Sequence, residues 1–334
     1  MGNPERRLQT VPMNRDHLPD LEVPMTEMMK AWVPDPGATA HIRLTEVAKP
    51  ELAADEVLIR VAAYSVNRGE TFLLEAPTPS WRPGKDVSGR VAAVGSDVQG
   101  FELGQRVVAH PDQAGWAEWV AVKADRVVAL PDGLDDVTAA AIPLAGLTAL
   151  RLTRATGPLA ARRVLLTGAS GGVGHAFVQL AAAQGARVTT IAANDERGHR
   201  LRELGAVETI PSIEEVTGLF DIALESTGGA ALAAAWEHLV ADGRLVWFGQ
   251  ASRSPATLDF FNWKGGMSAT LRKFYYLDDP SPVGVDLESL VRLVAQQRLH
   301  IEVGLTVDWR ETPVAIETLL GRRVRGNVVL RVEH

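Results

Sequence analysis

The sequence predicts an α/β protein in which a domain of short strands is joined to a doubly wound domain with a parallel sheet. Residues 162–174 have the pattern of a strand, a glycine-rich turn and the start of a helix. Strand and helix patterns then alternate from about residue 146 to residue 283, as they do in parallel sheets. Short apolar runs punctuated by Gly and Pro fill residues 29–122, which is typical of a small β-barrel.

The glycine-rich turn predicts a dinucleotide-binding site. The apolar run 164–167 predicts a buried strand, residues 173–181 carry the apolar stripe of a helix, and a second apolar run follows at 187–193. Backbone N–H groups and the helix dipole at such a turn bind a pyrophosphate. Ala169 replaces the first glycine of the dinucleotide pattern. The alternative interpretation is a tight turn that binds no ligand. The residues expected to contact the dinucleotide are Ala169, Ser170, Gly171, Gly172, Val173 and Gly174.

Composition and charge exclude several classes of protein. The chain has 334 residues, which is enough for two domains, and no apolar run approaches the length of about 20 residues that a membrane span needs. The net charge of −7, with both signs mixed along the chain, argues against nucleic acid or an anionic membrane as a partner. The absence of cysteine excludes disulfides and thiolate catalysis, and we expect a cytoplasmic protein.

Residues 1–28 differ from the rest of the chain. They carry charge and Pro and lack the continuous apolar segment of a secretory signal. We expect an N-terminal extension that is poorly ordered or lies on the surface.

The spacing of apolar residues sets the expected elements. Strands are expected at 29–33, 40–46, 56–64, 86–95, 105–109, 116–122, 164–167, 188–192, 220–225 and 243–249. Helices are expected at 135–141, 145–156, 230–240 and 287–297, and from residue 173. A final strand at 327–332 is expected to return to the first domain.

Several segments, in this order and at this spacing, resemble those of one superfamily. They are Tyr64-Ser-Val-Asn-Arg68, Pro83-Gly-Lys-Asp-Val-Ser-Gly89, Gly104-Gln-Arg-Val107, Pro143-Leu-Ala-Gly-Leu-Thr-Ala149, Gly168-Ala-Ser-Gly-Gly-Val-Gly174, Leu204-Gly-Ala206, Gly243-Arg-Leu-Val-Trp-Phe-Gly249 and Gly326-Asn-Val-Val-Leu330. From about residue 29 onward the chain resembles the medium-chain dehydrogenase/reductase superfamily. It looks most like the zinc-independent quinone oxidoreductase and enoyl reductase branch.

The resemblance implies two domains and a pairing of subunits. Residues 29–145 and 284–334 would form a GroES-like β-barrel catalytic domain, and residues 146–283 a Rossmann domain with the doubly wound sheet. The dinucleotide would lie between them, with its nicotinamide facing the catalytic domain. Relatives often pair through the last strands of the Rossmann sheet, which implies a homodimer. Aromatic residues at 260–263 and 274–276 either belong to that interface or line a pocket for a planar acceptor.

No metal site is expected. The resemblance matches the zinc-ligand positions of zinc-dependent relatives to Asn67, Lys85 and Leu144. An amide, an ammonium and an aliphatic side chain do not supply the nitrogen and sulfur ligands that zinc takes. The eight histidines, His110 among them, are scattered, and we expect them to be surface or packed residues.

NADPH is the expected cofactor. NAD-selective Rossmann domains place an acid at the end of the second strand, but the expected corner here is Ala193 or Asn194, and Asp195-Glu196 come slightly late. The resemblance matches Asn194 and Arg197 to the Ser-x-x-Lys pattern by which NADPH-using quinone reductases hold the 2′-phosphate. A guanidinium suits a phosphate through charge-assisted hydrogen bonds. The alternative is that Arg197 and Arg200 form a solvated helix face.

The resemblance places further residues near the nicotinamide and the phosphates. Asn327 stands where relatives often have a Lys that reaches the phosphates. The additional cofactor contacts expected are Thr148, Phe248, Gly249 and Asn327.

Three polar residues are candidates for catalysis. Tyr64 could donate a hydrogen bond or a proton to an enolate or quinone oxygen, or simply pack in the barrel. Asn67 could bind the substrate or the nicotinamide ribose, or occupy a turn. Lys85 replaces the usual apolar residue, so it could donate to the acceptor oxygen or pair with Asp86 or a surface acid. Arg68 replaces a common Pro.

The sequence therefore predicts an NADPH-dependent, zinc-independent reductase that transfers hydride to a quinone or an α,β-unsaturated carbonyl. One alternative is a dedicated biosynthetic enoyl or ketone reductase that acts on a polyketide intermediate. A second alternative, in another class, is a non-catalytic NADPH-binding or sensor protein.

Overall fold

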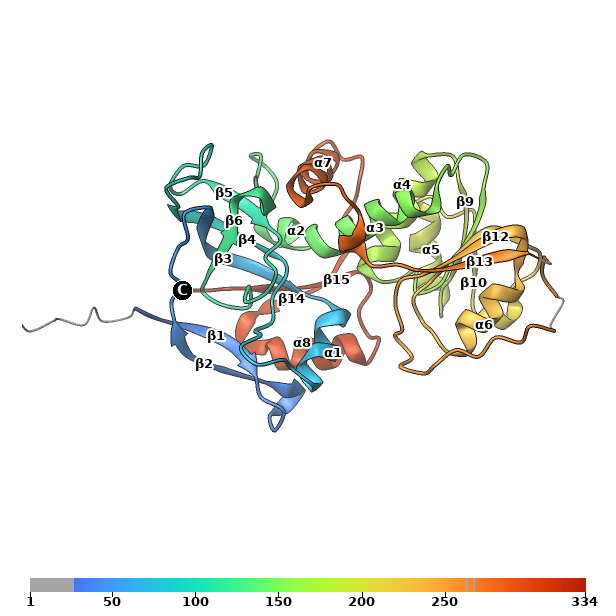
Figure 1. Cartoon of the computed structure of the whole chain (residues 1–334), viewed down its shortest axis with the longest axis horizontal. Coiled ribbons are helices and arrows are strands. Elements are labelled where there is room, and N and C mark those ends of the chain that lie inside the picture. Colours follow the sequence, from blue (N-terminus) through green and yellow to red (C-terminus); the bar gives the residue numbers. More distant parts are fainter. Residues whose placement is uncertain (1–26, 262–263, 267) are drawn as a thin grey trace, which may run out of the picture.

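The computed structural model of the chain describes residues 27–261, 264–266 and 268–334, and Figure 1 shows two sheet-containing domains. The strands are β1 Met28–Pro34, β2 Ile42–Ala48, β3 Glu56–Val66, β4 Val87–Val94, β5 Arg106–Ala109, β6 Trp119–Lys123, β7 Val127–Ala129, β8 Arg163–Leu166, β9 Arg187–Ile191, β10 Glu208–Ile210, β11 Phe220–Glu225, β12 Leu239–Trp247, β13 Ala269–Lys273, β14 Val303–Asp308 and β15 Asn327–Arg331. The α-helices are α1 Arg68–Glu75, α2 Asp136–Ala140, α3 Pro143–Thr156, α4 Gly172–Ala183, α5 Asp195–Glu203, α6 Ala230–Glu237, α7 Val283–Ala295 and α8 Thr312–Leu320. Short 3-10 helices are η1 Thr39–His41, η2 Ala124–Arg126, η3 Ile213–Glu215, η4 Tyr276–Asp278 and η5 Trp309–Glu311. None of the described helices is long and apolar enough to cross a membrane.

Two predicted segments fall wholly or partly outside the described residues. Only the last two residues of the extension at 1–28 are described. In the aromatic run at 260–263, Asn262 and Trp263 lie outside the described residues.

Seven strands form the sheet of the first domain. They follow the order β14-β15-β3-β4-β5-β7, and β6 pairs with β3. The long strand β3 pairs antiparallel with β4, β6 and β15. Because β15 lies inside this sheet, the predicted return of the final strand to the first domain is confirmed. Strands β1 and β2 form a separate antiparallel hairpin.

Six strands form a wholly parallel sheet in the second domain, in the order β10-β9-β8-β11-β12-β13. The chain builds outward from β8 through β9 and β10, and outward from β11 in the opposite direction. The winding therefore reverses between β8 and β11. In doubly wound sheets, ligands bind outside the carboxyl ends of the strands at this switch point. The predicted doubly wound sheet is confirmed, and the predicted glycine-rich turn lies at its switch point.

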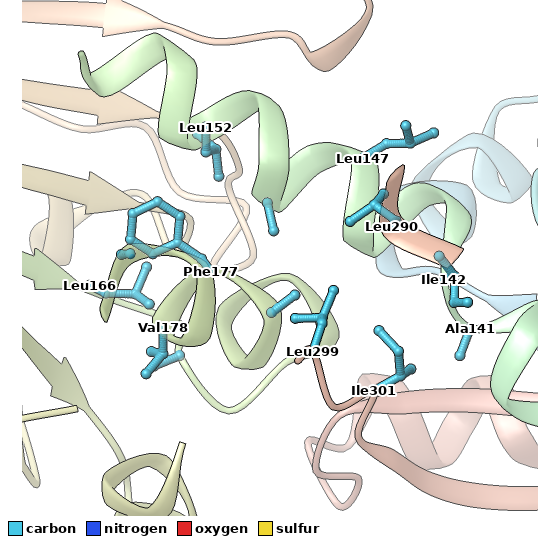
Figure 2. Close-up of a cluster of buried hydrophobic side chains, with 14 of the residues drawn as sticks. Ala141, Ile142, Leu147, Leu152, Leu166, Phe177, Val178, Leu290, Leu299 and Ile301 are labelled. Carbon is cyan, nitrogen blue, oxygen red and sulfur yellow. The ribbon is translucent and has the colours of Figure 1, made fainter. Parts of the chain in front are cut away.

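Helix α3 joins the two domains. The predicted boundary at 145/146 falls inside this one continuous helix, and the domain limits stay a prediction. Most of the helix is buried, because α4 and α7 pack against it. Figure 2 shows Leu147 of α3 in one buried cluster with Phe177 of α4 and Leu290 of α7. The cluster fixes the start of α3 relative to the glycine-rich turn.

Seven elements, α1, β7, α5, β10, β13, β14 and α8, are not among the strands and helices expected from the sequence. Strand β10 has only three residues, and four of the five residues of β13 are exposed, so neither shows an apolar pattern. Strand β14 has no fully buried residue. Helix α1 starts with polar residues, and its start is defined by a capping box between Asn67 and Glu70.

Candidate active site

The glycine-rich turn forms an open cradle at the start of α4. The helix has Gly171 as N-cap, with no side chain bonded to its first N–H groups. A Cβ at Gly174 would stand 2.3 Å from the carbonyl oxygen of Ala169, so only glycine fits there. Gly168 has a φ of +62°, which also favours glycine. Free N–H groups at the N-terminus of a 12-residue helix suit an anion such as a pyrophosphate.

The segment before β15 lies against this turn. Gly326 N–H donates to the carbonyl oxygen of Ser170 over 2.9 Å, and Gly326 forms a parallel bridge with Gly171. The next residue, Asn327, is buried and touches the turn, because a Cβ at Gly172 would stand 2.1 Å from its Oδ1. Asn327 Nδ2 donates to the carbonyl oxygen of Glu302 over 3.0 Å. The structure thus brings Asn327 together with the predicted turn residues.

The predicted 2′-phosphate residues lie side by side at the start of α5. The Asn194 side chain caps the helix and accepts from the Arg197 backbone N–H over 3.0 Å. Arg197 Nη2 donates to the carbonyl oxygens of Arg322, over 2.7 Å, and Val324, over 3.3 Å. The guanidinium is therefore held between the two domains by one nitrogen, and its role toward a phosphate stays a prediction.

The carboxyl ends of β11 and β12 complete the rim of the cradle. Fully buried Glu225 accepts from Thr167 Oγ1 (2.8 Å) and from the N–H groups of residues 227 and 228. Phe248 N–H donates to the Glu225 carbonyl oxygen, and a Cβ at Gly249 would stand 3.0 Å from the Ser226 carbonyl oxygen. The predicted contacts Phe248 and Gly249 therefore lie beside the turn. The sequence did not indicate Glu225, whose acceptor role depends on three separate segments.

A buried carboxylate organises the other side of the domain junction. Asp86 is 1% exposed and accepts four hydrogen bonds. They come from Ser65 Oγ (2.5 Å), Asn67 Nδ2 (2.7 Å), His110 Nδ1 (3.2 Å) and the Leu144 N–H (2.9 Å). Four donors satisfy the hydrogen-bonding capacity of a buried carboxylate. The position of Asn67 is thus explained by Asp86 as well as by its place in the capping box.

His110 connects Asp86 to the second domain. Its Nδ1 faces a carboxylate that can only accept, so Nδ1 carries a hydrogen. Its Nε2 lies 2.9 Å from the hydroxyl oxygen of Tyr276 in η4. Burial, followed by the charge of Asp86, raises the pKa of the Tyr276 hydroxyl, which keeps it protonated. Of the two expectations for His110, the packed imidazole is the one found.

Glu70 is a second buried carboxyl close to Asp86. Its Oε1 accepts from the Gly84 N–H over 2.8 Å, and its Oε2 accepts from Asn67. Burial first, and the charge of Asp86 second, raise the pKa of Glu70 to about 7. Two carboxyls bridged by the Asn67 amide can therefore hold a proton near neutral pH.

Tyr64 lies apart from this polar network. Successive residues of a strand face opposite sides, and its neighbour Ser65 already faces Asp86. Tyr64 is fully buried, stacks on Trp116 and bonds to Thr312 Oγ1 over 2.6 Å. These contacts fit the packing role, and a proton-donating role for Tyr64 has no support from its position.

Lys85 is half-buried and stands next to Asp86 in sequence. Within the described part of the chain its ammonium has neither a hydrogen-bond nor an ion-pair partner, so the expected pairing with Asp86 or a surface acid is not formed. An ammonium without a partner can donate to an acceptor oxygen.

Two of the three residues that the resemblance matches to zinc ligands form hydrogen bonds within the protein. The Asn67 amide and the Leu144 N–H both donate to Asp86. Among the residues that the structure describes, no three His, Cys, Asp or Glu side chains are arranged to hold a metal ion.

Comparison with known proteins matches a segment of each domain to a protein family. Residues 53–132 match the alcohol dehydrogenase GroES-like domain family, and residues 172–280 match the zinc-binding dehydrogenase family. A quinone oxidoreductase of Pseudomonas aeruginosa is 31% identical and is covered over 90% of its length by 82% of this chain. The structure of a quinone oxidoreductase from Coxiella burnetii superposes with a TM-score of 0.81 at 26% identity, over 92% of this chain and 100% of that one.

A second kind of relative is much longer. A mycocerosic acid synthase-like polyketide synthase of Mycobacterium tuberculosis is 27% identical over 92% of this chain, which spans only 15% of that relative.

The fold and the matched families define a two-domain protein with a GroES-like domain and a Rossmann-type domain. The chain belongs to the medium-chain dehydrogenase/reductase superfamily, in its quinone oxidoreductase-like branch. It is thereby a member of an oxidoreductase enzyme family.

Proposed function

We propose that the protein is an NADPH-dependent, zinc-independent oxidoreductase that reduces a quinone or an α,β-unsaturated carbonyl. The observation that carries this proposal is the arrangement at the domain junction. A glycine cradle at the switch point of a doubly wound sheet is joined through α3 to a buried network of Asp86, Asn67 and His110. In this network, Asn67 stands at one of the positions that the resemblance matches to a zinc ligand.

The residues present fit a dinucleotide. Gly174 packs too closely on the Ala169 backbone to carry a Cβ, and within the described residues no side chain accepts from the first N–H groups of α4. Asn194 and Arg197 stand where a 2′-phosphate would be recognised, and no acid occupies the Asn194 corner. Quinone oxidoreductase of Escherichia coli, with a TM-score of 0.81 and 22% identity, is described as complexed with NADPH. These points favour NADPH over NADH.

The chain's own residues would bind and orient the reactants. The bound dinucleotide supplies the hydride. Thr148, Phe248 and Gly249 would hold its nicotinamide end, and Asn327 would lie near its phosphates. The Lys85 ammonium would donate to the acceptor oxygen as negative charge develops there.

A panel of acceptors tests this function. Purified protein should oxidise NADPH in the presence of simple quinones or enones, and dialysis against a metal chelator should leave the rate unchanged. Tight NADPH binding without turnover of any acceptor would refute the enzyme and favour a binding or sensor protein.

A biosynthetic enoyl reductase is the second candidate, and the long polyketide synthase relative favours it. An enoyl thioester carried on a phosphopantetheine arm should then be reduced far faster than a simple quinone. Comparable kcat/KM values for the two would exclude this specialised role.

A homodimer is proposed through the edge of the parallel sheet. Strand β13 is an edge strand with exposed Leu271, and exposed Phe260 and Phe261 precede it. Unpaired edges and exposed aromatic groups favour association. Light scattering should give twice the mass of the chain, and Leu271→Lys should reduce that mass.

A further inference from the structure

We propose that Tyr276 delivers the proton to the acceptor oxygen and that His110, held by Asp86, restores the Tyr276 proton. This inference rests on the proposed reductase function and names the source of its proton. The three residues form a chain of hydrogen bonds, Asp86 to His110 over 3.2 Å and His110 to Tyr276 over 2.9 Å.

The chain of residues is assembled from both domains. Asp86 precedes β4 and His110 follows β5 in the first domain, whereas Tyr276 follows β13 in the second. Asp86, His110 and Tyr276 are all buried, with exposed fractions of 1%, 1% and 7%. Buried polar groups carry a desolvation cost that apolar side chains of similar size would avoid. A function at the domain junction accounts for their presence.

The chain of residues lies where an acceptor would be held. Asp86 also accepts from Asn67 and from the Leu144 N–H at the start of α3. One helix turn beyond Thr148, Arg151 donates to the carbonyl oxygen of Tyr276 over 2.8 Å and fixes its backbone. The backbone of Tyr276 is therefore tied to the same helix that carries the predicted nicotinamide contact.

The proton balance closes with these three residues. With a second hydrogen on Nε2, His110 donates to the Tyr276 oxygen, which frees the hydroxyl hydrogen for the acceptor. Hydride addition to the electrophilic carbon leaves negative charge on the acceptor oxygen. The Tyr276 O–H bond breaks as its proton moves to that oxygen, and the His110 Nε2–H bond breaks as its proton restores the hydroxyl. His110 ends neutral, with Nδ1–H on Asp86, and solvent returns the second proton.

Other charged and titratable groups face this chain of residues. Asp86, Tyr275, Glu70 and Asp112 act on Tyr276 electrostatically, and all of them raise its pKa. Asp112 is paired with Arg126 of η2, whose carbonyl oxygen accepts from the His110 N–H.

Tyr276→Phe tests the proton donor, with Tyr275→Phe as the matched control. Tyr275 is 49% exposed and lies outside the hydrogen-bonded chain. Loss of a general acid lowers kcat by roughly 100- to 10,000-fold. We expect that loss for Tyr276→Phe, with KM and the NADPH dissociation constant changed less than about twofold, because the ring still packs. Tyr275→Phe removes a hydroxyl outside the hydrogen-bonded chain and should lower kcat far less than Tyr276→Phe does.

His110→Ala tests the resupply of the proton. Its kcat should fall, and imidazoles added in solution should restore the rate in proportion to their basicity, which mere refilling of a cavity would not produce. The ¹⁵N resonances of His110 should also shift in Tyr276→Phe without any turnover.

The outcomes separate this inference from the proposed function. A wild-type enzyme that turns over, together with a Tyr276→Phe variant of unchanged kcat, would overturn the proton chain alone. A wild-type protein that binds NADPH and reduces nothing would overturn both. A loss of NADPH affinity equal to the loss of kcat would assign Tyr276 a structural role instead.

Discussion

Glu70 is buried among donors and next to another carboxyl, so its protonation is linked to folding. Its pKa in the folded protein is about 7, compared with an ordinary value of 4.5. Between these values the folded state binds more protons than the unfolded state. The free energy of unfolding therefore falls as pH rises through this window and levels off above about pH 7.

We predict that Glu70→Gln removes this pH dependence. Relative to the variant, the wild type should lose about 3 kcal/mol of stability between about pH 4.5 and pH 7. Urea unfolding of both proteins at several pH values measures the difference. The amide of the variant meets the Asn67 donors and changes the absolute stability, so the slope of stability against pH is the test. Parallel curves would show that Glu70 has an ordinary pKa.

Arg197 is expected to decide the choice of cofactor. Charge-assisted hydrogen bonds to a phosphate contribute roughly 1.5–3 kcal/mol. Arg197→Ala should therefore raise the NADPH dissociation constant roughly 10- to 100-fold and affect NADH much less. Fluorescence titration with both cofactors gives the ratio. Arg200→Ala is the control on the same helix, because Arg200 is paired with Glu203 and Glu302. Equal losses for the two cofactors in Arg197→Ala would contradict the assignment.

At the level of single residues, a site formed by residues adjacent in the sequence could be predicted. A site assembled from distant parts of the sequence could not. The turn residues are contiguous, so strand, glycine and helix signals identify them together. His110 is separated from Asp86 by 24 positions and from Tyr276 by 166, and no local pattern encodes such contacts. Tyr64 could not be assigned from sequence, because its role depends on the strand face that it occupies.

The contact between the start of α4 and the segment before β15 is close-packed. A Cβ at Gly172 would stand 2.1 Å from Asn327 Oδ1, whereas one at Gly174 would meet the backbone of Ala169 at 2.3 Å. The first clash involves the end of a side chain, and the second involves backbone that cannot move aside.

We therefore predict different outcomes for two glycine substitutions. Gly172→Ala should cost about 1–3 kcal/mol, typical of overpacking, and Asn327→Ala in the same chain should remove most of that cost. Gly174→Ala should be more damaging, and Asn327→Ala should not rescue it. Denaturant unfolding of the single and double variants measures the coupling. Full additivity of Gly172→Ala and Asn327→Ala would refute the contact.

Among the helices and strands, too, some could be predicted from the local sequence and others depend on tertiary contacts. Long strands with buried faces, such as β3, and the amphipathic helix α7 were predictable from apolar spacing. The edge strand β13 was not, because four of its five residues face solvent. Its place in the sheet comes from pairing with β12, which is a tertiary contact.

A buried ion pair holds the parts of the whole molecule in place. Arg151 of α3 and Asp286 of α7 are almost fully buried and bond over 2.9 Å, and Arg154 joins the same carboxylate. Arg151 also donates to the carbonyl oxygens of Tyr276 and Ser281. The pair therefore links α3, η4 and α7.

Asp286→Ala should destabilise the protein by about 3–5 kcal/mol, because it leaves a buried guanidinium without its counter-charge. Thermal or denaturant unfolding measures the loss. Arg310→Ala is the surface control, since that side chain is 59% exposed in its pair with Asp308 and its loss should cost far less. Similar losses in the two variants would indicate that the Asp286 pair is solvated.

The position of β15 between β14 and β3 has a consequence for biosynthesis. Chains emerge from the ribosome N-terminal end first, and domains fold as their last strand becomes available. All six strands of the parallel sheet are made before β14 and β15, so the second domain can fold while residues 63–66 of β3 in the first domain still lack their β15 partner. The domain whose strands are translated first is thus the domain that finishes folding last.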